Sequence, residues 1–448
     1  MEEFPIRDKE NESADIAFVT QKLSDVEILE QLEDIDVPTS ECVDTRCNEE
    51  NPSMARSEFD RLGFRVDQQE QEEEDSKAME TIGDFFGELP EHLMDNILAR
   101  VPVLTILRLR SVCKRWNALT SNSVFLENYS RPESRRAIES PVFLLYADQA
   151  RLSYPIYDPA SNAWHLLPQT LNSSPPGNLS PSSIVVLAAA GGLLCLTDTL
   201  SEPAAGTLNL YVSNPITRAW RRLPPTIWMP LSKPYVVGMV VDSIKNTYKI
   251  VVARNGDDLQ LQVYDSARNS WQIAGSVLRR LALIVGTAYT QGVLYCLEFG
   301  TGTGVSAYHI DRGLLEDVRA PMPHYLAWPQ LFVSRGHLMM VGAIAHWGIM
   351  RIICVWQLDS LQMEWVEVLR VPDDLLSGLS RQGDAGAHNL FVADGDYICF
   401  VSNQVKKMLM CDIFKKSWWW LPLCPFDTGD DAPNLSGFPL QPSLVASV

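Results

Sequence analysis

The sequence YDPASNAW, residues 157–164, is the first copy of a pattern that recurs through the second half of the chain. Five copies place an Asp or Asn six residues before a Trp: Asp158 and Trp164, Asn214 and Trp220, Asp265 and Trp271, Asp359 and Trp365, Asp412 and Trp418. A sixth has Asp311 in register, but Asp317 stands where the Trp would fall. Because an Asp or Asn side chain can bond to backbone amides two residues on, each copy predicts a tight turn.

The spacing of the copies predicts the architecture. Their sixth residues, at 164, 220, 271, 317, 365 and 418, are separated by 56, 51, 46, 48 and 53 residues. From Ser140 onward, short runs of Val, Ile, Leu, Tyr and Phe alternate with Gly, Pro, Asn and Asp, as in successive short strands. A period of about 50 residues with four strands per unit is typical of kelch-type propellers. The sequence therefore predicts a mostly β fold, a six-bladed kelch-type β-propeller over residues 140–448.

The first repeat is short. It offers three strands, at Val142–Ala147, Tyr154–Tyr157 and Trp164–Leu167. We expect the missing innermost strand to come from the C-terminal segment Pro439–Ser447, because pairing the first repeat with the last would leave no open sheet edge. We expect each repeated Trp to wedge between neighbouring blades.

The longer connections of a propeller lie on the face opposite its tight turns, and binding residues favour such loops. Several of these connections carry Trp, Tyr or Arg, the usual anchors of protein interfaces. We predict that this loop face binds a target protein, with the following candidate residues: Trp228, Tyr325, Trp328, His346, Trp347 and Arg381. The alternative is that these aromatic side chains pack beneath their own loops.

A helical motif precedes the repeats, with the sequence LPEHLMDNILARVPVLTILRLRSVCKRW at residues 89–116. Its apolar residues recur at helical spacing, and Val101-Pro102 should end the first helix, since the residue before a proline avoids the α region. Short helices with this many large apolar side chains need a partner surface. From the pattern alone, a helical cap packed on the neighbouring domain is an equal alternative.

The order of residues in this stretch resembles the F-box. The resemblance is carried by Leu89-Pro90, Ile97-Leu98, Val101-Pro102 and the run from Val112 to Trp116, and it continues through Phe125 and Leu126. It implies docking on a Skp-type adaptor and, through it, on a cullin. The residues implied to hold the adaptor or the motif's own small core are Leu89, Pro90, Leu93, Ile97, Leu98, Leu104, Leu107, Val112 and Trp116.

The repeats are similar to plant kelch and F-box-associated repeat domains. Gly191-Gly192 is a full diglycine of the kelch kind, whereas Asn214-Pro215 and Tyr248–Val251 look more like the F-box-associated version. The choice between these two labels stays open.

The formal charge of −19 is concentrated at the N-terminus. Residues 1–80 hold 25 Asp or Glu against 8 Lys or Arg, a net of −17, which leaves −2 for residues 81–448. Such an acidic segment predicts a disordered tail, in which residues 16–35 could form a marginal amphipathic helix. The near-neutral remainder does not support nucleic-acid binding. The expected division is a tail at 1–80, an F-box at 83–130, a linker at 131–139 and the propeller at 140–448.

The cysteines, the N-terminus and the apolar runs indicate the cellular compartment in which the protein is expected. Nine cysteines without a C-x-x-C pair fit a reducing compartment. The N-terminus lacks the basic-then-apolar design of a secretory signal, and no apolar run reaches the length of about 18 residues that suggests a membrane span. We therefore expect a nuclear or cytoplasmic protein without a membrane partner.

Enzyme signatures are absent from the sequence. The seven histidines show no H-x-H or H-x-x-H spacing, and neither a G-x-S-x-G motif nor a P-loop occurs. We predict no catalytic residues, no metal and no cofactor. The expected function is substrate recognition in a Skp–cullin–F-box ubiquitin ligase that promotes degradation of an unknown target protein. The alternatives are a scaffold or transcriptional co-regulator that causes no degradation, and a propeller oxidase or hydrolase.

Overall fold

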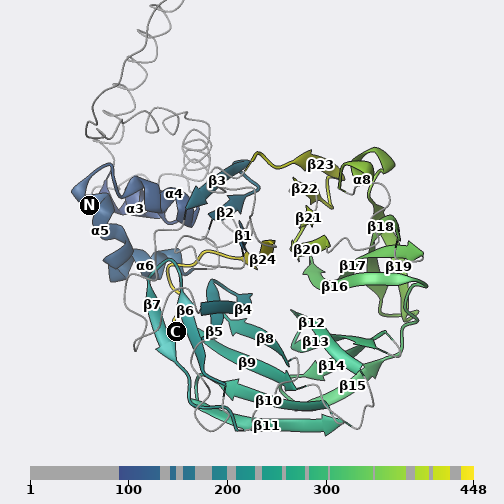
Figure 1. Ribbon diagram of the computed structural model, residues 1–448. Coiled ribbons are helices and arrows are strands. Elements are labelled where there is room, and N and C mark those ends of the chain that lie inside the picture. Colours follow the sequence, from purple (N-terminus) through teal and green to yellow (C-terminus); the bar gives the residue numbers. More distant parts are fainter. Residues whose placement is uncertain are drawn as a thin grey trace, which may run out of the picture. The chain divides into compact units, whose positions relative to one another are not determined.

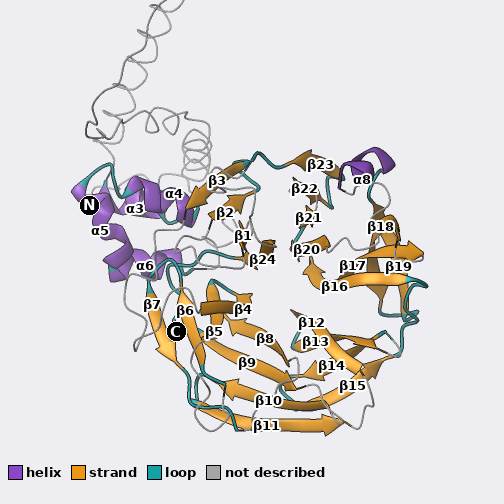
Figure 2. Cartoon of the chain, in the orientation of Figure 1, coloured by secondary structure: helices purple, strands orange, loops and turns teal. Residues whose placement is uncertain are grey.

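The computed structural model divides the chain into two compact units, residues 1–138 and 139–448. Helices make up the described part of the first unit and strands dominate the second (Figure 2). The structure describes residues 90–131, 142–147, 155–166, 184–198, 208–227, 235–254, 259–277, 282–300, 303–346, 349–379, 389–402, 407–423 and 435–448. The predicted acidic tail, the helix expected at residues 16–35 and most of the predicted linker lie outside these ranges.

The first unit is a cluster of short helices. They are α3 (Glu91–Leu98), α4 (Val103–Leu109), α5 (Lys114–Ala118), the 3-10 helix η2 (Leu119–Ser121) and α6 (Ser123–Tyr129). Proline precedes both α3 and α4, and its fixed φ suits the start of a helix. The Asn122 side chain caps α6 by accepting from the amides of Val124 and Phe125, at 2.9 and 3.2 Å. Ile106 and Phe125 are fully buried at the centre.

The second unit contains, in its described residues, six four-stranded antiparallel sheets. Five are built from four consecutive strands, and the sixth combines the last strand with the first three. We number them in chain order. Sheet 1 holds β24 (Leu435–Leu440), β1 (Val142–Ala147), β2 (Pro155–Asp158) and β3 (Ala163–Leu166); sheet 2 holds β4 (Ile184–Ala190), β5 (Leu193–Asp198), β6 (Leu210–Asn214) and β7 (Ala219–Arg222).

The remaining sheets follow the same order. Sheet 3 holds β8 (Tyr235–Asp242), β9 (Thr247–Arg254), β10 (Leu259–Asp265) and β11 (Ser270–Val277); sheet 4 holds β12 (Ala282–Thr290), β13 (Val293–Gly300), β14 (Gly304–His309) and β15 (Leu314–Val318). Sheet 5 holds β16 (Leu326–Ser334), β17 (His337–His346), β18 (Ile349–Asp359) and β19 (Glu364–Arg370); sheet 6 holds β20 (Asn389–Asp394), β21 (Tyr397–Ser402), β22 (Lys407–Asp412) and β23 (Ser417–Trp420).

The sheets form a ring (Figure 1). Around the ring, β24 contacts β4, β4 contacts β8, and contacts continue through β12, β16 and β20 back to β24. The arrangement is a β-propeller, as the repeat spacing predicts. Apolar clusters fill the space between neighbouring sheets, for example between sheets 5 and 6 and between sheets 2 and 3.

The repeated Asp or Asn and four of the five repeated tryptophans have the roles expected of them. Asp or Asn accepts from backbone amides of its own turn in all five copies, as in Asp265 to the amide of Ala267 at 2.9 Å. The indole nitrogens of Trp164 and Trp271 donate to the carbonyls of Pro422 and Pro224, which follow the last strand of the preceding sheet. Trp365 and Trp418 also pack against clusters shared by two sheets. These tryptophans therefore join neighbouring blades.

The strand that completes sheet 1 lies earlier than the segment suggested by the sequence. β24 pairs with β1 antiparallel, from Leu435 opposite Ala147 to Leu440 opposite Val142. Only two residues of the expected segment, Pro439 and Leu440, belong to it. The residues after it, 441–448, which we call the C-terminal tail, form hydrogen bonds with sheets 2 and 3 instead.

One helix was not expected from the sequence. Residues 373–388 carry polar residues typical of a loop, yet Asp373–Leu379 forms α8. Leu376 and Leu379 are buried in the cluster between sheets 5 and 6, and this burial stabilises the helix. No helix in the described ranges is long and apolar enough to cross a membrane.

Candidate functional site

The helical unit separates the residues expected to bind an adaptor into core and surface. Ile97 and Leu98 are only 3% and 1% exposed, so their side chains hold the unit's own core and offer no surface to a partner. Leu93, Leu104, Leu107 and Trp116 are half-buried. Pro90 is exposed, Val112 is 56% exposed, and Leu89 lies outside the described residues.

Val124 is an exposed apolar residue that the motif comparison did not single out. It is 63% exposed at the start of α6, while Phe125 and Tyr129 of the same helix are buried. Phe125 and Tyr129 are four residues apart and share the buried side of α6, so Val124, one residue before Phe125, points away from that side. This helical spacing could have identified Val124 from the sequence. Pro90, Val112 and Val124 give the unit apolar surface that the other residues of the described range 90–131 leave exposed.

Polar contacts hold these helices in position. The Arg115 guanidinium donates to the Asp95 carboxylate at 3.1 Å and ties α5 to α3. Arg110 donates through Nε to Asn117 at 3.1 Å. Because both contacts are exposed, each stabilises the unit only modestly.

The loop face of the propeller brings together two of the aromatic side chains expected there. The rings of Tyr325 and His346 are in contact, with centroids 4.2 Å apart and their planes tilted by 44°. The amide of Ala345 donates to the Tyr325 carbonyl at 3.0 Å. Tyr325 is 65% exposed. It has a φ of +59°, in the left-handed region, which is uncommon for a residue with a side chain.

Trp328 and His346 were expected in loops, and that expectation is wrong. Trp328 lies within β16 and His346 ends β17, opposite Ile349 of β18. A bulge between Ala327 and Gln330 lets β16 continue this far. Gly342 on β17 lets this part of β16 approach closely, since a Cβ at position 342 would stand 2.8 Å from the Leu326 side chain. Trp328 packs against the cluster between sheets 5 and 6.

The other candidates for target binding lie outside the described part of the chain: Trp228, Trp347 and Arg381. The structure thus places Tyr325 and His346 together, and it assigns Trp328 mainly to packing.

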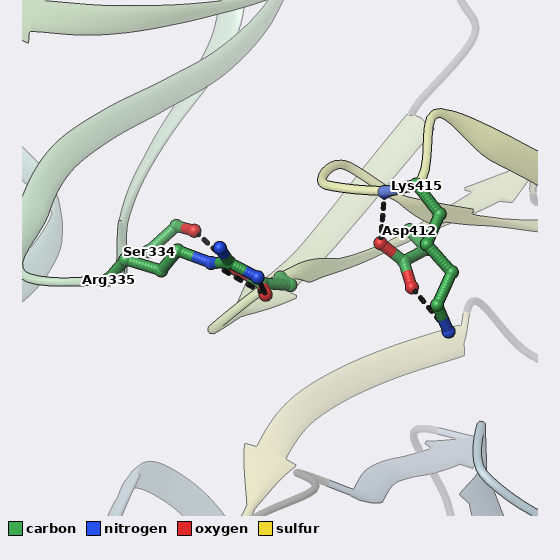
Figure 3. A network of polar contacts seen from close by, with 5 residues as sticks. Ser334, Arg335, Asp412 and Lys415 are labelled. Carbon is green, nitrogen blue, oxygen red and sulfur yellow. Dashed lines mark hydrogen bonds and ion pairs between the residues drawn. The ribbon is translucent and has the colours of Figure 1, made fainter.

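The turn face carries a charged contact between sheets 5 and 6 (Figure 3). Arg335 donates to both carboxylate oxygens of Asp396, with Nε at 3.0 Å from Oδ2 and a terminal nitrogen at 2.7 Å, and the Ser334 hydroxyl also donates to this carboxylate. The hydrogen bonds from Arg335 hold the pKa of Asp396 below its usual range. The guanidinium also lies 3.6 Å from the centroid of the Phe414 ring. Arg335 is therefore engaged within the protein.

The cysteines of the second unit are buried thiols. Burial raises the pKa of Cys195 and Cys296 to about 12, and Cys399 and Cys411 are fully buried as well. A thiol with so high a pKa is a poor nucleophile and a poor metal ligand. Among the described residues, no group of three or more His, Cys, Asp or Glu is placed to hold a metal ion.

Comparison with known proteins agrees with this division of the chain. Residues 86–128 match the F-box domain model. The chain is 25% identical to F-box only protein 6 of Arabidopsis thaliana, over 77% of this chain and 71% of that protein. It is 25% identical to an F-box/kelch-repeat protein of the same plant, over 80% of this chain and 89% of that protein. Among solved structures, TolB from Acinetobacter baumannii matches with a TM-score of 0.43 and 8% identity, covering 67% of this chain and 66% of TolB.

The chain thus carries an F-box domain, and it has F-box/kelch-repeat homologues over most of its length.

Proposed function

We propose that this chain is the substrate-recognition subunit of a Skp–cullin–F-box ubiquitin ligase. The F-box match at residues 86–128 carries the proposal, since it spans the described helices of the first unit except the last residue of α6. An F-box domain typically binds a Skp-type adaptor. The homologues named as F-box/kelch-repeat proteins support a substrate-adaptor role, and their names point to a non-catalytic protein.

In this proposal the helical unit docks on the adaptor through exposed apolar side chains. Pro90 and Val112 are exposed, with half-buried leucines nearby in sequence, and Val124 adds a further candidate. Apolar surface of this kind on so small a unit is typical of a protein interface. Ile97 and Leu98 act indirectly by keeping the helices packed.

The propeller binds the target protein in this proposal, through its loop face. Tyr325, exposed and in contact with the ring of His346, is the described residue best suited to anchor a partner. The chain performs no chemistry itself. Holding the target near the ubiquitin-charged enzyme converts an encounter between free proteins into a local reaction. The proposed location is the nucleus or the cytoplasm, where such ligases would meet their targets.

Adaptor capture tests the first half of the proposal. Purified Skp-type adaptor should retain the wild-type chain, and the double variant Pro90→Ala/Val112→Asp should be retained at least about tenfold less, because a buried charge opposes docking. Glu127→Ala, an exposed change on α6, is the matched control and should bind normally. Unchanged circular dichroism would show that each variant is folded. Failure of the wild-type chain to bind the adaptor would exclude the ligase assignment.

The degradation of a target protein tests the second half of the proposal. Proximity labelling with the variant Pro90→Ala/Val112→Asp, which should not bind the adaptor, should enrich target proteins, because they would bind the chain without being degraded. The half-life of such a target should lengthen in cells that carry this variant. An unchanged half-life, with target binding intact, would favour the scaffold instead.

A further inference from the structure

A cavity runs between the six innermost strands of the propeller. Its volume is about 850 Å³, within the range of roughly 300–1,000 Å³ that is usual for ligand pockets. Every sheet contributes an apolar residue to its wall: Val185, Val236, Val285, Val333, Phe391 and Phe438. Two aromatic residues, Tyr289 and Trp328, also line it. These side chains form apolar patches between the polar groups of the wall, and the patches can contact an apolar part of a ligand.

Asp394 gives this cavity a negative charge. It is the charged residue among the described residues of the lining, and it ends β20, next to the tight turn at Gly395. Gly395 donates its amide to the carbonyl of Val333 at 3.0 Å, which sets Asp394 level with the end of β16. Trp328 lies five residues before Val333 on β16, which is roughly 17 Å along the strand. Trp328 and Asp394 therefore lie near opposite ends of the cavity.

The Asp394 carboxylate lacks a cationic partner within the described ranges. Gln441 of the C-terminal tail donates to its Oδ2 at 3.1 Å, and this amide is neutral. Burial raises the pKa of Asp394, which means that the surroundings oppose its negative charge. Asp394 is half-buried, so a ligand cation would meet a carboxylate that has lost part of its hydration.

The contact with Gln441 has a structural purpose, since it links sheet 6 to the tail that follows β24. It does not explain the charge, because the side-chain oxygen of an asparagine could accept the same hydrogen bond. The combination of an acid, a neutral partner and a cavity with apolar side chains from every sheet fits a ligand that has an apolar stem and its own positive charge.

We propose that this cavity binds an alkylammonium group, with the apolar stem against the wall and the cation paired with Asp394. The group could belong to a free alkylamine or to a lysine side chain of a bound polypeptide. This inference does not depend on the role in ubiquitin ligation.

The test uses the full-length chain and two probes of equal shape, hexylamine and hexanol. Hexylamine should raise the unfolding temperature and hexanol should not. Asp394→Asn should weaken the binding of hexylamine at least about tenfold, because a charge-assisted hydrogen bond in a half-buried site becomes a neutral contact. It keeps the acceptor for Gln441, so the fold should persist. The matched control is Asp359→Asn, in an exposed turn outside the cavity, and it should bind hexylamine as the wild type does.

A second pair of probes identifies the source of the cation. A short peptide with one lysine is compared with its norleucine counterpart on the wild-type chain and on Asp394→Asn. Asp394-dependent binding of hexylamine alone supports the proposal with a free amine as ligand, and binding of the lysine peptide alone supports it with a polypeptide as ligand. The proposal is overturned if neither cation stabilises the wild-type chain, or if both bind Asp394→Asn equally well.

Discussion

Asn214 shows how a single residue adapts a repeated motif to a different task. The other four complete copies have Asp at this position, which only accepts hydrogen bonds when ionised. Asn214 accepts from the amide of Ile216 in its own turn, as the aspartates do. Its amide nitrogen also donates to the carbonyls of Ser443 and Ala446 in the C-terminal tail, at 3.0 and 2.9 Å. Asn214 is fully buried, so these contacts exclude water.

We expect Asn214→Asp to destabilise the propeller by roughly 2–4 kcal/mol, because it would set a buried carboxylate against two carbonyl oxygens. Denaturant unfolding followed by tryptophan fluorescence measures this change. The control is Asn162→Asp, an exposed position whose side-chain oxygen still accepts from the Tyr157 hydroxyl, and it should cost less than about 0.5 kcal/mol. Equal midpoints for Asn214→Asp and the wild type would contradict this account.

Gly192 explains the diglycine of the second repeat. Its φ is +86°, and a Cβ at this position would stand 2.5 Å from the Cβ of Ser443 and 2.8 Å from the carbonyl oxygen of Gln441. Glycine is needed here both for the backbone conformation and for the close approach of the C-terminal tail. From the sequence alone, the pair fitted a kelch motif, whereas its contact with residues some 250 positions later had no local signal.

At the scale of elements, the C-terminal tail fastens sheet 1 to sheets 2 and 3, in addition to the contact of Gln441 with sheet 6. It leaves β24 in sheet 1, meets Asn214 of sheet 2, and reaches the turn of sheet 3, where Asn246 donates to the carbonyl of Val445 at 3.1 Å. Leu444 and Ala446 are buried along the way. The tail thus adds apolar burial and hydrogen bonds to the strand pairing of β24.

Deleting residues 442–448 should lower the free energy of unfolding by more than about 3 kcal/mol, since it removes a buried leucine and the partners of two asparagines. Deleting 436–448 should be worse, because β1 would lose its partner and leave an open edge prone to aggregation. Thermal unfolding and light scattering measure the two effects. Removal of Ser447 and Val448 alone spares the Asn214 contacts and serves as the graded control. If the longest deletion left the unfolding midpoint unchanged, β24 would not be needed to hold the ring.

The helices and strands also show which features the sequence patterns could predict and which they could not. The Asp turns and the Trp contacts could be predicted because their signal recurs at a fixed spacing within each repeat. The position of β24 could not, since its pairing with β1 joins residues almost 300 apart and the segment LSGFPL has no alternating pattern. Trp328 was misplaced for a related reason. Its strand extends past a bulge that Gly342 permits, and nothing near Trp328 in the sequence marks that glycine as its neighbour.

For the candidate sites, the sequence identified residue types better than their exposure. Ile97 and Val112 both matched the F-box pattern, yet one is buried and the other exposed. Short helices pack through turns whose angles the periodicity does not specify, so burial had to come from the structure. Asp394 was not singled out, because one acid at the end of a strand resembles any other turn residue until the cavity is known.

At the scale of the whole molecule, the two units each have a core of their own. The helical unit buries residues such as Ile106 and Phe125, and the propeller has clusters between its sheets. Compact units of this kind usually fold independently. We therefore expect a fragment of residues 139–448 to unfold cooperatively, at the same midpoint as the propeller transition of the full chain.

Thermal unfolding of the fragment and of the full chain, followed by near-ultraviolet circular dichroism, tests this prediction. The signal reports the packing of the propeller's tryptophans. The same fragment ended at residue 434 lacks β24 and should not give the native spectrum. Loss of the native spectrum in the complete fragment would show that the propeller needs the first unit to fold.

The composite sheet has a consequence for the order in which the protein is made. The helical unit is complete once residue 129 has left the ribosome, whereas sheet 1 must wait for residue 440. Domains generally fold as they emerge, from the N-terminal side. A nascent chain, or one shortened by a premature stop codon, would therefore present a finished F-box beside an unclosed ring. If the chain docks on an adaptor as proposed, such a product would occupy the adaptor without holding a target, so truncating mutations late in the gene should act dominantly.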